Sequence, residues 1–183
     1  MNARDLSYIA VSTAFLCVSA WLAIPIAGVP FTLQTLVLCL TAGLLGWKRA
    51  TIATLAYLLL GVIGAPVFSG FLGGVSVLLS HTGGYLVGFV PLAAIVGVAG
   101  DKLADKNGVK GKVCLGLCMG LGILVCYILG TVWFVTVAAQ NSETVGLWTA
   151  LTLCVFPYFV FDAFKVILAV FLTGKLRKFI KIK

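Results

Sequence analysis

The sequence contains few charged residues. Only 10% of its 183 residues are Asp, Glu, Lys or Arg, whereas about a quarter is usual in soluble domains. Hydrophobic residues make up 62% of the chain and the mean hydropathy is +1.18. This composition excludes a soluble globular protein and predicts an integral membrane protein.

Residue types that support catalysis or metal binding are also scarce. One histidine and five carboxylates leave little choice for nucleophilic catalysis. No Gly-rich loop ends in Lys-Ser or Lys-Thr, so the chain is not expected to hydrolyse ATP. The six cysteines all fall in predicted membrane spans, where a thiol behaves as a small hydrophobe. We therefore expect no catalytic residue, no metal and no cofactor.

Six apolar stretches approach the length of a bilayer-spanning helix, which is about 20 residues. Such long runs, without polar alternation, predict helices rather than the strands of a closed barrel. The second and third stretches are short and are separated only by Lys48 and Arg49, so they are expected to form a tight helical hairpin. The stretches cover residues 6–26, 33–47, 50–64, 83–100, 113–138 and 147–173.

The basic residues predict the orientation of these spans. Twelve of the thirteen Lys and Arg residues lie at the termini or in every second connection, and the intervening connections contain none. Because Lys and Arg accumulate on the cytoplasmic side, both termini are predicted to be cytoplasmic. The net charge of +8 then reflects topology and attraction to anionic lipids, not nucleic-acid binding. The prediction is an all-α protein of six transmembrane helices, forming one membrane domain over residues 1–183.

The thirteenth basic residue, Lys165, lies inside the last apolar stretch, three residues after Asp162. Each charge near the centre of a membrane helix costs about 2.5–3.5 kcal/mol, so such residues usually face the bundle interior and mark a site. Three residues apart on a helix, the two side chains share a face. They predict a pocket for a polar ligand with N–H donors beside a C=O acceptor. The alternative is a structural ion pair that ties the last span to its neighbours.

Two further segments are candidates for the walls of this pocket. Pro157 can kink the last span above the pair, and Tyr158 lies one turn before Asp162, where it could cover an apolar ring or simply pack. The connection at 65–82 has no Lys, Arg, Asp or Glu, and its glycines, including Gly74, argue against a straight helix. We expect it to fold over the outer mouth as a lid, with Gln34 and Thr35 on the opposite wall.

Four motifs in this order resemble the bacterial BioY family, the biotin-binding S components of energy-coupling factor (ECF) transporters. They are Gly-Val-Pro-Phe-Thr-Leu-Gln-Thr at 28–35, Gly-Val-Ile-Gly-Ala-Pro-Val-Phe-Ser-Gly-Phe at 61–71, Thr-Gly-Gly-Tyr-Leu-Val-Gly-Phe at 82–89 and Pro-Tyr-Phe-Val-Phe-Asp-Ala-Phe-Lys at 157–165. The resemblance covers nearly the whole chain.

The resemblance implies a subunit of a bacterial plasma membrane transporter that captures biotin with high affinity from outside. A transmembrane coupling protein and two ABC-type ATPases would supply the energy. Asp162 and Lys165 would hold the ureido ring, and Tyr85, Gln34 and Thr35 would line the pocket. The family's use of small residues on the first helix points to Ala10 and Ala14 as the contact with the coupling protein.

Two other functions are compatible with the residues alone. In a self-sufficient secondary carrier, Asp162 would take part in proton coupling, although no inverted repeat or pair of broken helices is evident. An intramembrane enzyme would need more catalytic groups than the single histidine offers. Uptake by the isolated chain would favour the first alternative, and turnover of a lipid or peptide would favour the second.

Overall fold

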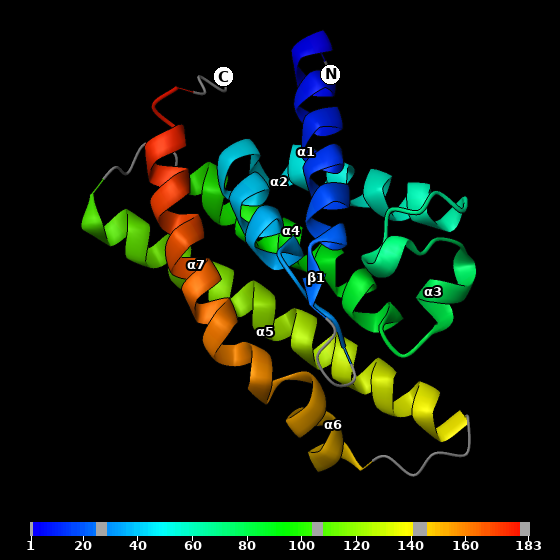
Figure 1. The fold of residues 1–183 in the computed structure, drawn as a ribbon. Helices are drawn as coiled ribbons and strands as arrows, with labels where there is room; N and C mark the ends of the chain where they lie inside the picture. Colours follow the sequence, from blue (N-terminus) through cyan, green and yellow to red (C-terminus); the bar gives the residue numbers. More distant parts are fainter. Residues whose placement is uncertain (1, 25–28, 104–107, 141–145, 180–183) are drawn as a thin grey trace.

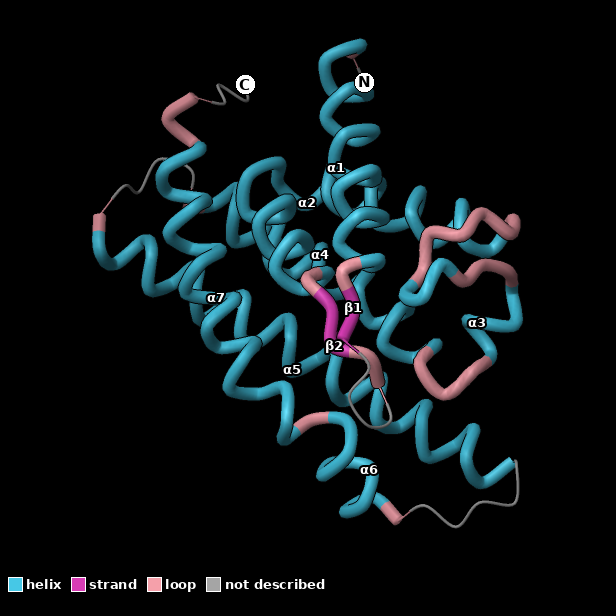
Figure 2. Tube along the Cα trace, viewed as in Figure 1, coloured by secondary structure: helices cyan, strands magenta, loops and turns pink. Residues whose placement is uncertain are grey.

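The computed structural model describes residues 2–24, 29–103, 108–140 and 146–179. Over these residues it forms seven α-helices, one 3-10 helix and one two-stranded antiparallel sheet (Figures 1 and 2). The elements are α1 (Ala3–Trp21), β1 (Ala23–Ile24), β2 (Phe31–Thr32), α2 (Gln34–Val62), η1 (Ser69–Phe71), α3 (Val75–Leu79), α4 (Gly83–Lys102), α5 (Val109–Gln140), α6 (Leu147–Cys154) and α7 (Phe156–Leu176).

Among the described helices, α4, α5 and α7 are each long and apolar enough to cross a membrane, and α2 reaches that length when the residues on both sides of Gly46 are counted together. The most buried of these four is α4. The start of α1 and the end of α7 lie at the same end of the molecule (Figure 1). The chain is therefore an all-α fold with membrane-spanning helices.

Glycines on two sides of α4 allow its neighbours to approach closely. A Cβ atom at Gly84 would lie 2.2 Å from Cβ of Trp133 on α5, and one at Gly97 would lie 2.3 Å from Cα of Trp47 on α2. Small residues at such positions let helix backbones come into van der Waals contact. This contact stabilises helix packing in lipid, where the hydrophobic effect does not drive helices together. This close packing holds α2 and α5, which carry parts of the site, on opposite sides of α4.

The connection between the second and third predicted spans differs from the expectation. The chain turns at Gly46, two residues before Lys48, and splits α2 into a first arm at 34–45 and a second arm at 47–62. Gly46 has φ 78° and ψ 175°, a conformation that is essentially restricted to glycine. Lys48 and Arg49 begin the second arm instead of forming the connection.

The last predicted span, 147–173, is divided at Val155 into α6 and α7. Val155 has φ −122° and ψ −57°, and Pro157 occupies the first turn of α7. A proline fits there because the first turn of a helix needs no intrahelical N–H donor. The expected interruption near Pro157 is confirmed, and it takes the form of a complete break between two helices.

A short hairpin that the sequence did not predict precedes α2. Ala23 pairs with Thr32 and Ile24 with Phe31. Figure 2 places this hairpin between the end of α1 and the start of α2. Its second strand brings the backbone of Phe31 and Thr32 next to α7, where the Thr32 carbonyl accepts a hydrogen bond from Lys165.

Arg177, directly after α7, joins the ends of two other helices. Its guanidinium donates to the carbonyl oxygens of Gly43 at 2.7 Å, Gly100 at 2.6 Å and Leu103 at 3.0 Å. These carbonyls belong to the last turns of the first arm of α2 and of α4, where no intrahelical donor remains. Arg177 therefore ties α2, α4 and α7 together at one end of the molecule.

Replacing Arg177 with Met is expected to lower the free energy of unfolding by about 2–3 kcal/mol, because partly buried carbonyls lose a charged donor. Thermal unfolding of the purified protein in detergent measures this change. Lys178→Met is the matched control, since Lys178 is exposed and adjacent. Equal melting temperatures for the two variants would contradict this role of Arg177.

Candidate binding site

The site begins on the inner face of α7. Tyr158, Asp162 and Lys165 are spaced four and three residues apart, so their side chains share one helix face. All three are buried, with exposed fractions of 6%, 5% and 8%. Charged groups this buried require partners, which neighbouring elements supply.

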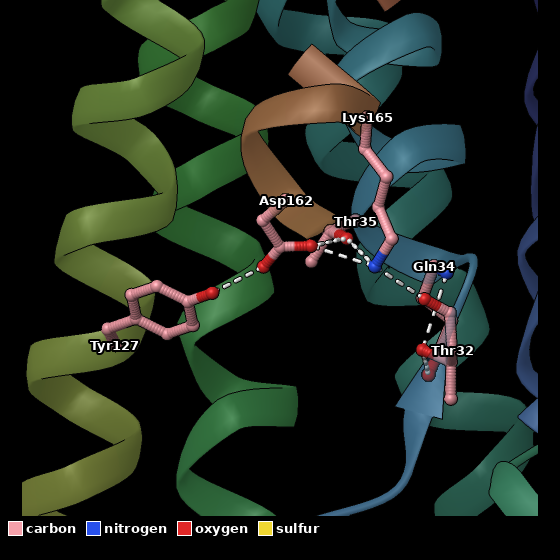
Figure 3. A network of polar contacts seen from close by, with 6 residues as sticks. All are labelled: Thr32, Gln34, Thr35, Tyr127, Asp162 and Lys165. Carbon is pink, nitrogen blue, oxygen red and sulfur yellow. Dashed lines mark hydrogen bonds and ion pairs between the residues drawn. The ribbon is translucent and has the colours of Figure 1, made fainter. Parts of the chain in front are cut away.

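The Lys165 ammonium has three hydrogen-bond partners, one for each of its protons. Nζ donates to Asp162 Oδ1 at 2.7 Å, to Thr35 Oγ1 at 3.0 Å and to the Thr32 carbonyl at 2.7 Å (Figure 3). It also lies 4.1 Å from the centroid of the Phe31 ring, within the range of a cation–π interaction. The pair thus connects α7 to β2 and α2, and is not a bond between two residues alone.

Asp162 accepts bonds from three elements. Oδ1 accepts hydrogen bonds from the Lys165 ammonium and from the Thr35 hydroxyl, the second at 3.0 Å. Oδ2 accepts a hydrogen bond from the Tyr127 hydroxyl of α5 at 2.5 Å. Each carboxylate oxygen can accept about two hydrogen bonds. Oδ1 is therefore saturated, whereas Oδ2 accepts from Tyr127 alone among the described residues. One acceptor position on Oδ2 remains for a ligand donor.

A cavity of about 420 Å³ opens beside this network. Aromatic and aliphatic side chains dominate its walls, and polar groups gather near Asp162 and Lys165, a combination typical of small-molecule sites. Its lining comes from the β2 region, the start of α2, the 65–82 connection, α4, α5, α6 and α7. The lining includes Val29, Pro30, Phe31, Thr32, Gln34, Thr35, Phe68, Ser69, Leu72, Gly73, Ser76, Val77, Ser80, Thr82, Tyr85, Leu86, Phe89, Ile123, Cys126, Tyr127, Cys154, Tyr158, Asp162 and Lys165.

The wall formed by the start of α2 is held by its own hydrogen bonds. The Gln34 amide donates to the Tyr57 hydroxyl at 2.7 Å and accepts from the Thr32 hydroxyl at 3.1 Å. On the other side, the Tyr158 hydroxyl donates to the Val29 carbonyl. These contacts fix the 29–34 segment between α2 and α7, so that the Thr32 carbonyl points at Lys165.

The 65–82 connection forms the far wall. Phe68 is 1% exposed and packs edge-on against Tyr57 at 5.5 Å between ring centroids. Hydrogen bonds from two indole N–H groups hold the two ends of the connection. Trp21 donates to the Pro66 carbonyl at 2.8 Å, and Trp133 donates to the Ser80 carbonyl at 3.0 Å. Such contacts explain how an apolar, glycine-containing connection keeps a defined position across the cavity.

Six of the predicted ligand-binding residues line one cavity: Gln34, Thr35, Tyr85, Tyr158, Asp162 and Lys165. Gly74 is not among its lining residues. Its N–H donates to the Gly61 carbonyl at 2.7 Å, and the preceding Gly73 lines the cavity instead. Ala10 and Ala14 are exposed on α1, outside the cavity.

Sequence reasoning missed Tyr127 and the Phe31–Thr32 backbone. Tyr127 is the only tyrosine in the predicted span 113–138, and a lone phenol in an apolar run is a signal that could have identified it. The Thr32 carbonyl carries no such signal, because every residue has one. Among the described residues no three His, Cys, Asp or Glu side chains gather in a way that could hold a metal ion.

Replacing Tyr127 with Phe is expected to weaken binding of the pocket's ligand about tenfold, since a hydrogen bond to a charged group is worth about 1.5–3 kcal/mol. Asp162 would lose the donor that orients Oδ2. Isothermal titration calorimetry measures the change, with Tyr8→Phe on α1 as the matched control. Unaltered affinity in a folded Tyr127→Phe variant would contradict this orienting role.

Comparison with known proteins gives consistent matches over nearly the whole chain. The BioY family matches residues 1–182. The biotin transporter BioY of Thermotoga maritima is 37% identical over 175 residues, covering 96% of each chain. The probable biotin transporter BioY of Pyrococcus horikoshii is 34% identical, covering 97% of this chain and 98% of its own. A 2.1 Å crystal structure of the S component for biotin from an ECF-type ABC transporter superposes with a TM-score of 0.81 at 29% identity, over 97% of this chain and 95% of that one.

Proposed function

Because the chain belongs to the BioY family and is a biotin-binding S component of an ECF-type transporter, we propose that Asp162 and Lys165 hold the ureido ring of biotin. The protein is a multi-pass membrane protein that binds substrate for transport, and it is not an enzyme. The observation that carries the proposal is the open acceptor position on Asp162 Oδ2, beside a buried ammonium in a cavity of suitable size.

The ureido group carries N–H donors on either side of a carbonyl acceptor. In the proposed complex one N–H donates to Asp162 Oδ2, the oxygen with spare capacity. The ureido oxygen then accepts from Lys165, whose three protons are bound in the structure by Asp162, Thr35 and the Thr32 carbonyl. Only the Thr32 carbonyl belongs to a hairpin rather than a long helix. We propose that the ureido oxygen replaces it.

The apolar part of biotin fits the remaining walls. Tyr158 on α7, Tyr85 on α4 and Phe89 one turn further along α4 all line the cavity. Their rings supply apolar area for the bicyclic head and the methylene chain. The 65–82 connection would close over the ligand as a lid, supported by its position along the far wall.

The proposed topology has six crossings with cytoplasmic termini. It counts α1, the two arms of α2, α4, α5 and α7, with α6 as a short helix before the last crossing. Two observations support it: the shared end of α1 and α7 in Figure 1 and the distribution of Lys and Arg over alternate connections. The site would then open outward, and the chain would reside in a bacterial plasma membrane.

The proposed partners are a transmembrane coupling protein and two ABC-type ATPases of an ECF module. Ala10 and Ala14, exposed and four residues apart on α1, would let a partner helix approach closely. Bulky substitutions there, such as Ala14→Leu, would then impair uptake with the module but leave biotin binding intact.

Two measurements test the proposal. Mass spectrometry of the purified protein is expected to identify biotin as a copurifying molecule, and calorimetry is expected to give one high-affinity site. Absence of biotin binding would contradict the proposal. Uptake by the chain alone in proteoliposomes, abolished by collapsing the proton gradient, would contradict the dependence on a module.

A further inference from the structure

The charges in the cavity are confined to one side. In the sequence no Lys or Arg lies between Arg49 and Lys102, or between Lys112 and Lys165. Among the described residues that line the cavity, Lys165 is the only cationic side chain and Asp162 the only carboxylate, and both belong to α7. The wall formed by the 65–82 connection is uncharged.

Polar groups at the end of this connection already bind one another. The Ser80 hydroxyl donates to the Val77 carbonyl at 2.6 Å and lies 3.1 Å from the Thr82 hydroxyl. The Gly83 N–H donates to the Ser80 carbonyl at 3.0 Å. His81 is directed at Phe134 of α5, with 5.2 Å between ring centroids, and is not among the lining residues. Among its described residues, this wall therefore offers an anion no cationic donor.

With the ureido ring at α7, the valerate tail lies beside uncharged walls, which include the 65–82 connection. A carboxylate moved from water into such surroundings would lose hydration without gaining a cation. From these observations, which rest on the proposed function, we infer that the pocket recognises the ureido head and not the charge of the tail. The carboxylate stays hydrated at the mouth. The ligand class therefore includes uncharged tail derivatives, the amide and the methyl ester of biotin.

Calorimetry on the full chain in detergent tests this inference with three ligands: biotin, biotin amide and biotin methyl ester. The Kd of each neutral derivative is expected to lie within about threefold of that of biotin. A carboxylate held by a charged donor would instead make them about 10- to 100-fold weaker. If neither derivative binds while biotin still does, the inference is overturned but the proposed function is not. Failure of all three ligands would contradict the proposed function as well.

An added cation gives a second, independent test. Ser76 lines the cavity and is exposed, so a longer side chain can be accommodated there. Ser76→Lys is expected to raise the preference for biotin over biotin amide at least fivefold, and the neutral control Ser76→Gln should leave the ratio unchanged. An equal ratio in both variants would contradict the placement of the tail along this wall.

Discussion

Replacing Asp162 with Asn is expected to weaken biotin binding by about a hundredfold or more. An amide presents one oxygen and one NH₂ group where the carboxylate presents two acceptors. Depending on its orientation, the NH₂ group would face either the Tyr127 hydroxyl and the ureido N–H or the Lys165 ammonium and the Thr35 hydroxyl. In both orientations the Lys165 ammonium would lose its buried counter-charge. Each unmet charged hydrogen bond costs about 1.5–3 kcal/mol, and a factor of ten corresponds to about 1.4 kcal/mol.

Calorimetry on the purified variant measures this loss, with Asp5→Asn as the matched control. Asp5 also pairs with a basic residue, Arg49, at 2.8 Å, but lies near the start of α1, away from the cavity. Unchanged affinity for biotin in a folded Asp162→Asn variant would contradict the assignment of Asp162 to the binding site.

A double variant separates binding from a purely structural ion pair. Lys165→Met alone should destabilise the fold, because it leaves Asp162 buried without its cation. Asp162→Asn combined with Lys165→Met should recover part of that stability, since no buried charge remains unpaired, while biotin binding stays lost. Recovery of binding in the double variant would mean that the pair only ties α7 to its neighbours.

Replacing Gly46 with Ala is expected to reduce the free energy of unfolding by about 3 kcal/mol or more. The conformation of Gly46, φ 78° and ψ 175°, costs other residues about 1–3 kcal/mol. A Cβ atom there would also lie 1.9 Å from Asp101 Oδ1. Asp101 cannot move away freely, because its carboxylate accepts the Trp47 N–H at the start of the second arm, at 3.1 Å. Losing that bond would add about 1–3 kcal/mol.

Thermal unfolding in detergent, with size-exclusion chromatography to detect aggregation, measures the effect. Gly120→Ala is the control: Gly120 lies inside α5, and a Cβ atom there would meet nothing within 4 Å. That change should be neutral or stabilising by up to about 1 kcal/mol, because alanine favours the helix. A melting temperature for Gly46→Ala equal to that of the native chain would show that the turn of α2 tolerates a side chain.

Most of the correct predictions about the fold and the site concern residues that lie within one segment of the chain. The spacing of Tyr158, Asp162 and Lys165 placed them on one face of α7, and Pro157 predicted an interruption nearby. The hairpin of β1 and β2 escaped prediction because each strand has only two residues, too few for a periodic pattern. The turn of α2 was expected at Lys48 and Arg49, since basic residues usually mark a connection, but the backbone conformation favoured Gly46.

The sequence by itself determined that the chain is a helical membrane protein and that an acid and an amine lie together in its last long helix. A helix that spans lipid must be long and apolar, and a charge inside it is costly unless it has a partner. Both requirements can be recognised within a single segment of the sequence. The tertiary structure decided the rest of the network. Tyr127 and the Thr32 carbonyl lie 35 and 133 residues from their partners on α7. Contacts over such separations depend on helix packing, which no local pattern records.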